Sequence, residues 1–217
     1  LKQSALLPPP VKDIYHLVIL PVFKERRAIV EPGLESLVDG MYPPERVLFV
    51  VALEERASSG VKRDVYDLQA RYRPSFMDFL VVEHPPSIEG EARVKGANAT
   101  WAARHAAEYF RGRRIPFENV IVSCFDADTV AYREYLACLT YHFMVTPERL
   151  RASYQPIPVY YNNVWEVPGF ARIIDIGTSF FQLIQATNTE KLVTFSSHSM
   201  SFKALVEVGY WPVDIIS

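Results

Sequence analysis

The chain has 217 residues, of which 49% are hydrophobic and 22% are charged, and its formal net charge is −2 at pH 7. This composition is that of a globular protein with one sizeable core, and it excludes a disordered chain. The near-neutral charge removes the electrostatic case for a general nucleic-acid binder, so no nucleic-acid partner is expected. No apolar run approaches the ~18–20 residues that would span a bilayer.

The two ends of the chain are expected to differ from its middle. Residues 1–13 include three consecutive prolines and have the composition of an N-terminal arm or linker. Residues 14–217 are predicted to form a single domain. The chain begins at a leucine and stops abruptly at Ser217, so we expect a piece of a larger protein, truncated at its C-terminal end. Membrane contact is expected only through segments of that larger protein.

The chain has two cysteines, Cys124 and Cys138, in or near predicted core elements. Their positions predict two buried free thiols in a reducing compartment rather than a disulfide framework. The expected location is therefore the cytoplasm, including the cytoplasmic face of a membrane for the full-length protein. No Cys-x-x-Cys pair or Cys/His cluster in the sequence indicates a zinc site.

Strand-like apolar runs and helical spacing alternate along the first two thirds of the chain. Strands are predicted at residues 16–22, 46–53, 79–82 and 119–125, and helices at residues 27–38, 61–72, 92–110 and 132–144. The first of these helices carries Pro32 and Gly33, which interrupt its first half. Strand-helix repetition at this spacing predicts a parallel sheet with helices on both faces.

The rhythm changes after Pro147. Strands are predicted at residues 152–161 and 192–196, and helices at residues 173–186 and 202–209. An aromatic cluster at residues 160–165 has two interpretations, as part of the core or as a platform for a sugar acceptor, because aromatic faces suit sugar rings.

The pair of acids in Asp126-Ala127-Asp128 directly follows an apolar strand-like run. At the carboxyl end of a central strand in an open α/β sheet, side chains point into the crevice where ligands bind. Two carboxylates there are costly to desolvate together unless a cation neutralises them. A divalent cation that carries a diphosphate explains the pair, since hard cations take carboxylate and phosphate oxygens as ligands. The alternative is an ordinary solvated turn.

The order of four segments resembles a family 2 glycosyltransferase with the fold called GT-A, over nearly the whole chain from about Ile14. These segments are Pro21-Val22-Phe23-Lys24-Glu25, Lys95-Gly96-Ala97-Asn98, Asp126-Ala127-Asp128, and the stretch from Ser199 to Trp211. The resemblance implies an α/β fold, a three-layer α/β/α sandwich around a mixed, mostly parallel sheet.

The resemblance also implies roles for particular residues. The nucleotide would be bound by Pro21, Glu25, Glu54, Lys95 and Asp126. Glu54 follows a strand that usually ends in an aspartate in this family, so it stands there as a substitute. A divalent cation, Mn2+ or Mg2+, would be held by Asp126 and Asp128, with His198 as a further candidate ligand.

The implied function is metal-dependent transfer of a glycosyl group from a nucleotide-diphosphate sugar, a UDP-sugar in the first instance, to an acceptor hydroxyl. The acceptor would be a glycan, a lipid or another hydroxyl compound, and the resemblance implies inversion at the sugar carbon. The family's general base is an acid soon after the closing helix, so it is expected just past Ser217. Asp214 is the candidate within the chain, and little transfer is expected from this piece alone.

Other interpretations of the same residues stay open at this point. A phosphatase of the haloacid dehalogenase type also uses Asp-x-Asp after an apolar strand, and Asp126, Asp128 and the adjacent Thr129 fit that pattern. Two strand-helix units precede Asp126, however, whereas that motif normally opens its domain. A non-catalytic domain that binds nucleotide sugars is the third possibility. Glu25 could equally stabilise the start of a helix, and Lys95 could be an ordinary solvated lysine.

Overall fold

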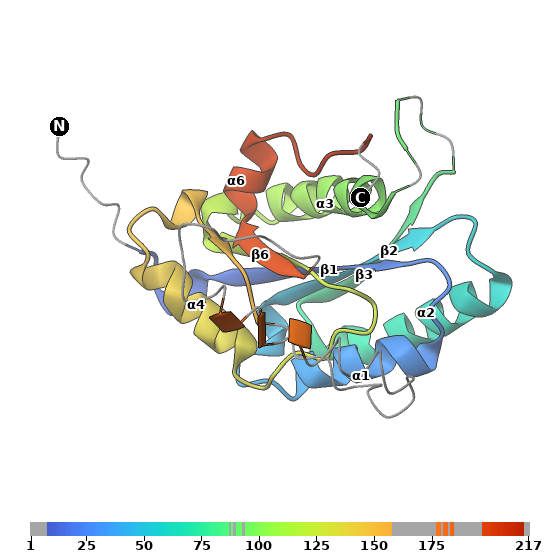
Figure 1. The fold of residues 1–217 in the computed structure, drawn as a ribbon, viewed down its shortest axis with the longest axis horizontal. Coiled ribbons are helices and arrows are strands. Elements are labelled where there is room, and N and C mark those ends of the chain that lie inside the picture. Colours follow the sequence, from blue (N-terminus) through green and yellow to red (C-terminus); the bar gives the residue numbers. More distant parts are fainter. Residues whose placement is uncertain are drawn as a thin grey trace.

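A mixed sheet forms the middle layer of the protein (Figure 1). The computed structural model describes residues 8–86, 88, 90–92, 94–157, 177–178, 180–181, 183–184 and 197–214. The strands are β1 (Tyr15–Val22), β2 (Val47–Glu54), β3 (Asp78–His84), β4 (Val120–Cys124), β5 (Ser153–Tyr154) and β6 (His198–Ser201). The helices are α1 (Arg27–Val38), α2 (Ser59–Tyr72), α3 (Lys95–Gly112), α4 (Tyr135–Val145) and α6 (Phe202–Glu207).

Short 3-10 helices connect several of these elements. They are η1 (Val11–Asp13), η2 (Pro44–Arg46), η3 (Arg73–Ser75), η4 (Phe117–Asn119) and η5 (Arg149–Arg151).

The strand order among the described residues is β3-β2-β1-β4-β6-β5. The first four strands run parallel, with Ile19 of β1 level with Val50 of β2 and with Cys124 of β4. β6 runs antiparallel to β4 and pairs Cys124 with His198. The start of β6 therefore lies at the carboxyl ends of the parallel strands, where ligands bind in open α/β sheets.

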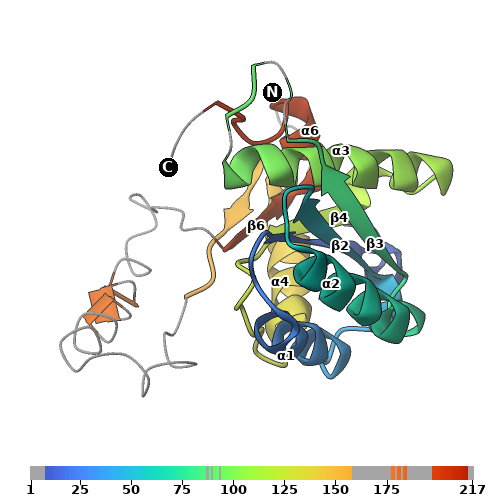
Figure 2. The ribbon, with the colours of Figure 1, turned by 90° about the vertical axis from the view of Figure 1, so that its right-hand side faces the viewer.

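Helices cover both faces of the sheet, as Figures 1 and 2 show. α1, α2 and α4 pack on one face, and α3 and α6 pack on the other. The parallel strands are apolar on both sides because both faces are covered. α3 approaches its face closely through a row of small buried residues, which are Ala99, Ala102, Ala103, Ala106 and Ala107. This architecture confirms the predicted three-layer sandwich around a mixed, mostly parallel sheet.

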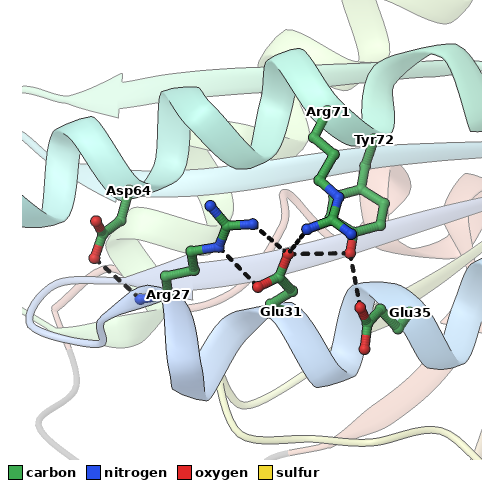
Figure 3. A network of polar contacts seen from close by, with 6 residues as sticks. All are labelled: Arg27, Glu31, Glu35, Asp64, Arg71 and Tyr72. Atoms are coloured by element: carbon green, nitrogen blue, oxygen red, sulfur yellow. Dashed lines mark hydrogen bonds and ion pairs between the residues drawn. The ribbon is translucent and has the colours of Figure 1, made fainter.

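Polar contacts join α1 to α2 on the outer side of one layer (Figure 3). Glu31 accepts hydrogen bonds from Arg27, Arg71 and Tyr72, with donor–acceptor distances between 2.7 and 3.1 Å. Tyr72 also contacts Glu35 at 3.0 Å. The hydrogen bonds from Arg27 chiefly lower the pKa of Glu31 to about 2. The network therefore holds Glu31 in its charged form.

Most predicted elements are present, with shifted ends. The helix predicted at residues 92–110 begins at Lys95, and the strand predicted at residues 152–161 is regular only over Ser153–Tyr154 among its described residues. The strand predicted at residues 192–196, the aromatic cluster at residues 160–165 and much of the helix predicted at residues 173–186 lie outside the described residues. The α1 helix runs through Pro32 without ending there.

The prediction of two buried thiols is wrong for Cys138, which is exposed on the solvent side of α4. Cys124 is buried at the end of β4, and burial raises the pKa of its thiol to about 11. Both cysteines are free. The error arises because α4 is apolar around much of its circumference, so its pattern does not separate the inner from the outer face. Within the described residues, no helix is long and apolar enough to cross a membrane.

Candidate nucleotide and metal site

The acidic turn after β4 lies at the carboxyl edge of the sheet. Phe125 continues from β4 and donates its N–H to the carbonyl of Ile19 on β1 at 3.0 Å. The chain then turns, and the N–H of Thr129 donates to the carbonyl of Asp126 at 3.0 Å. The side chain of Asp126 is 41% exposed, and Asp128 is exposed as well. Two carboxylates that a ligand can reach therefore follow β4 at this edge of the sheet.

The acidic turn rests on α1. A Cβ atom added at Gly33 would lie 2.6 Å from the carbonyl oxygen of Thr129, closer than real Cβ contacts come. Ser36, one helical turn further, accepts a hydrogen bond from the N–H of Ala131 at 3.0 Å. Gly33, which interrupts the helical pattern in the sequence, is therefore the residue that allows the turn to pack against the helix.

Lys95 and Asp126 form an ion pair across the edge. Lys95 opens α3, and its Nζ donates to Oδ1 of Asp126 at 2.5 Å. The first turn of a helix carries unpaired N–H groups and a partial positive charge, so a lysine there is best accommodated beside an anion. Because the two side chains are 35% and 41% exposed, solvent screens the pair, which contributes about 0–1 kcal/mol to stability.

A serine outside the predicted site connects the acidic turn to the start of β6. The N–H of Asp126 donates to Oγ of Ser197 at 3.3 Å, and Thr129 contacts the same hydroxyl at 3.3 Å. Gln155 donates to the carbonyl of Ser197 at 3.1 Å. The sequence offered only a weak signal for Ser197, a serine in a run of small polar residues before His198.

Buried hydroxyls fix β6 against β4 and α4. Ser199 lies 2.7 Å from Ser123 and 2.8 Å from the hydroxyl of Tyr135. Burial is the main cause of a raised pKa at Tyr135. His198, next in the chain, accepts a hydrogen bond at Nε2 from the indole of Trp211 at 3.3 Å. Metal binding through this nitrogen would require Trp211 to move, and a metal role for His198 stays a prediction.

The remaining predicted nucleotide residues lie at the ends of β1 and β2. Pro21 is half-buried near the end of β1. The carboxylate of Glu25 accepts hydrogen bonds from the N–H groups of Phe23 and Lys24, at 2.8 and 3.0 Å, so in this structure it stabilises its own turn. Glu54 ends β2 and pairs with Arg56 at 3.0 Å.

Glu54 also lines a small hollow between β2, β3 and the loop that precedes α3. His84 and Glu91 face each other in it at 3.0 Å, and each side chain is only 9% exposed. This hollow lies beside α3, the helix that carries Lys95.

The donor atoms at the edge suit a hard cation that arrives with phosphate. Within the described ranges, no group of three or more His, Cys, Asp or Glu side chains could hold a metal ion by itself. Carboxylate oxygens from Asp126 and Asp128 match the one or two protein ligands that Mg2+ usually takes beside substrate phosphates. Asp214, the predicted candidate base, is exposed and follows residues 209–213, which approach α3 at Gly96.

The fold matches solved structures at low sequence identity. Mannosyltransferase PcManGT from Pyrobaculum calidifontis, in complex with GDP-Man and Mn2+, matches with a TM-score of 0.60 and 19% identity, over 99% of this chain and 52% of that chain. S. aureus TarS 1-349 matches with a TM-score of 0.53 and 13% identity, over 94% of this chain and 52% of that chain. The same protein in complex with UDP-GlcNAc gives 0.51 and 11%, over 91% and 48%.

This chain therefore spans about half the length of these structures. Its sequence matches no protein-family model and no curated protein sequence. At these identities the likeness establishes the fold, which is the GT-A fold of glycosyltransferases, with its mostly parallel sheet and an antiparallel strand beside β4.

Proposed function

We propose that the protein takes part in metal-dependent transfer of a glycosyl group from a nucleotide-diphosphate sugar to an acceptor hydroxyl. The observation that carries the proposal is the meeting of Lys95 and Asp126 beside Asp128, at the carboxyl edge of the sheet. The fold supports it, because it is shared with a mannosyltransferase in complex with GDP-Man and Mn2+. Two carboxylates and an ammonium group at one edge are chemically suited to a cation and a diphosphate, which supports the proposal.

The carboxylates and the lysine at this edge would have different roles toward the diphosphate. Asp126 and Asp128 would hold a divalent cation, Mn2+ or Mg2+, which acts as a Lewis acid on the leaving diphosphate. Lys95 would contribute a point charge to the phosphates. In this structure Lys95 pairs with Asp126.

The nucleoside would lie toward the ends of β1 and β2, beside Pro21, Glu25 and Glu54. A UDP-sugar is our first choice of donor, and the acceptor would be a glycan, a lipid or another hydroxyl compound. Asp214 is the candidate general base within the chain, and its place next to the segment that crosses α3 puts it on the same side of the sheet as Lys95. We propose inversion at the sugar carbon.

Calorimetric titration of UDP and GDP, each with and without Mn2+, tests the proposal. We expect binding that depends on Mn2+. In Asp128→Asn we expect the affinity to fall by about tenfold or more, because a ligand oxygen is lost while the shape is kept. Asp39→Asn, an exposed acid at the end of α1, is the matched control and should bind as the unsubstituted protein does. Unchanged Mn2+-dependent affinity in a folded Asp128→Asn protein contradicts the metal role.

A second comparison addresses the phosphate contact. Lys95→Ala should weaken UDP much more than uridine, because the ammonium group would touch phosphate and not base. Lys12→Ala is the control, because Lys12 is exposed and lies before the start of β1. Equal weakening of both ligands removes Lys95 from the phosphate site. If neither UDP nor GDP binds and the protein hydrolyses an aryl phosphate in the presence of Mg2+, the phosphatase interpretation of Asp126 and Asp128 is favoured.

A further inference from the structure

The segment after α6, residues 209–213, turns back across the first turn of α3, and we call it the strap (Figure 1). Its turn is made by Gly209 and Tyr210, whose φ angles are +84° and +74°. A tyrosine in this left-handed region is strained by roughly 1–3 kcal/mol and persists only where surrounding contacts hold it. Backbone strain of this kind is often kept at functional positions.

Hydrogen bonds join the strap to α3, to the loop before α3 and to β6. The hydroxyl of Thr100, a fully buried residue of α3, donates to the carbonyl of Trp211 at 3.0 Å. The N–H of Ala92, in the loop that leads into α3, donates to the carbonyl of Val213 at 2.8 Å. The indole of Trp211 donates to His198 at 3.3 Å. The strap thus connects the start of β6, the loop before Lys95 and the first turn of α3.

Gly96 allows the strap to approach the helix. A Cβ atom added at Gly96 would lie 2.4 Å from the carbonyl oxygen of Pro212 and 3.9 Å from Cβ of Trp211. Because the clashing atom belongs to the backbone, any side chain at this position has to push the strap away from the helix. Gly96 directly follows Lys95, whose Nζ reaches Asp126.

We propose that Gly96 and Thr100 are positioning residues of the site: they seat the strap on α3, and the seated strap fixes the first helical turn from which Lys95 reaches the diphosphate. This inference rests on the proposed function only for the diphosphate. The physical reason is that Lys95 stands at the junction of the loop and the helix, and the strap is hydrogen-bonded to both. Without the strap, the loop loses its bond from Ala92, and the turn that orients Lys95 loses a packed neighbour.

Two pairs of variants test the proposal. Gly96→Ala introduces the clash with Pro212, whereas Gly112→Ala, at the other end of the same helix, places a Cβ that meets no described atom within 4 Å outside its chain neighbours and its own helical backbone. Gly96 is the second residue of α3 and Gly112 is the last, so helix propensity favours alanine at both positions by less than the ~1 kcal/mol of a helix interior. Thr100→Val removes the hydroxyl at nearly constant shape, and Thr100→Ser keeps it.

Amide hydrogen exchange over residues 90–95 and 209–214 reports the strap directly. We expect faster exchange at Ala92 and along the strap in Gly96→Ala and Thr100→Val, and exchange as in the unsubstituted protein in Gly112→Ala and Thr100→Ser. Calorimetry with UDP and Mn2+ should show about tenfold weaker binding in the first two variants, while uridine binding stays unchanged, as expected for a lost charge-assisted contact.

These measurements test the seating of the strap by Gly96 separately from the positioning of Lys95 by the strap. Exchange in Gly96→Ala equal to that of the unsubstituted protein overturns the seating role of Gly96. A released strap with unchanged UDP affinity, or with equal weakening of UDP and uridine, overturns the positioning of Lys95. If the unsubstituted protein binds no nucleotide diphosphate, the proposed function fails and the positioning role fails with it, while the exchange data still decide whether Gly96 seats the strap.

Discussion

His16 offers a quantitative test of how β1 and α4 are packed, because it is fully buried and its ring makes one hydrogen bond to the described residues. Its Nε2 lies 2.8 Å from the hydroxyl of Thr140, which itself donates to the carbonyl of Leu136. The histidine must therefore donate from Nε2, and its Nδ1 has no hydrogen-bond partner among the described residues. A second proton would add a buried charge with no acceptor. Burial accordingly lowers the pKa of His16 from 6.5 to about 3.

The lowered pKa of His16 makes the stability of the protein depend on pH, because the folded and unfolded states bind different numbers of protons. Between pH 3 and pH 6.5 the unfolded chain binds a proton at this histidine and the folded protein does not, so stability falls as the pH falls below 6.5. The limiting slope is about 1.4 kcal/mol per pH unit. Integrated from about pH 8 to about pH 5, this single group should remove about 2 kcal/mol from the free energy of unfolding.

The assay is urea unfolding at a series of pH values from about 8 to about 5, with the linear dependence on urea extrapolated to water. His16→Gln keeps a donor for Thr140 and cannot titrate, so its stability should be nearly independent of pH over this range. His105→Gln, an exposed histidine of α3, should keep the slope of the unsubstituted protein. Equal losses of free energy in the unsubstituted protein and in His16→Gln between the two ends of the range would contradict the lowered pKa of His16.

Two further predictions concern the acidic turn and the surface network. Gly33→Ala should displace the turn at Thr129 and weaken Mn2+-dependent UDP binding several-fold in a folded protein, as calorimetry would show, whereas Gly112→Ala should not. Glu31→Gln should lower the free energy of unfolding by about 1 kcal/mol at neutral pH, a modest value because solvent reaches Arg27 and Arg71. The pKa of Glu31 is lowered in the folded protein, so its stabilisation is present above pH 4.5 and lost toward pH 2. Urea unfolding of both proteins should therefore converge at low pH, and a constant difference would contradict this assignment.

The parallel half of the fold could be predicted because its strands are buried on both faces. Runs such as residues 47–53 contain almost nothing but Val, Leu and Phe, and such a run has few places in a protein other than a covered parallel strand. Helical spacing on either side then fixes the layers. The antiparallel half was missed at β6, because His198–Ser201 is short and polar and its partners, Ser123 and Tyr135, are distant in sequence.

Only part of the candidate site could be predicted from the sequence. Asp126 and Lys95 could be placed at one edge because each follows or precedes an element with a strong pattern, and the structure brings their side chains together. Ser197, the contact of Gly33 with Thr129 and the contact of Gly96 with Pro212 depend on backbone approaches between distant segments. A glycine in the sequence indicates that some close approach occurs, but not which segment approaches.

The charged groups of this protein differ in how much they contribute to its stability. His16 and Glu31 are tied to packing, and the structure supplies a partner that makes each arrangement stable. Lys95 and Asp126, by contrast, are each more than one third exposed, so their mutual attraction adds about 0–1 kcal/mol to stability. The fold has little need of this pair. Substitution of either residue should therefore leave the protein folded, and any loss of nucleotide-diphosphate binding in these variants can be assigned to the site itself.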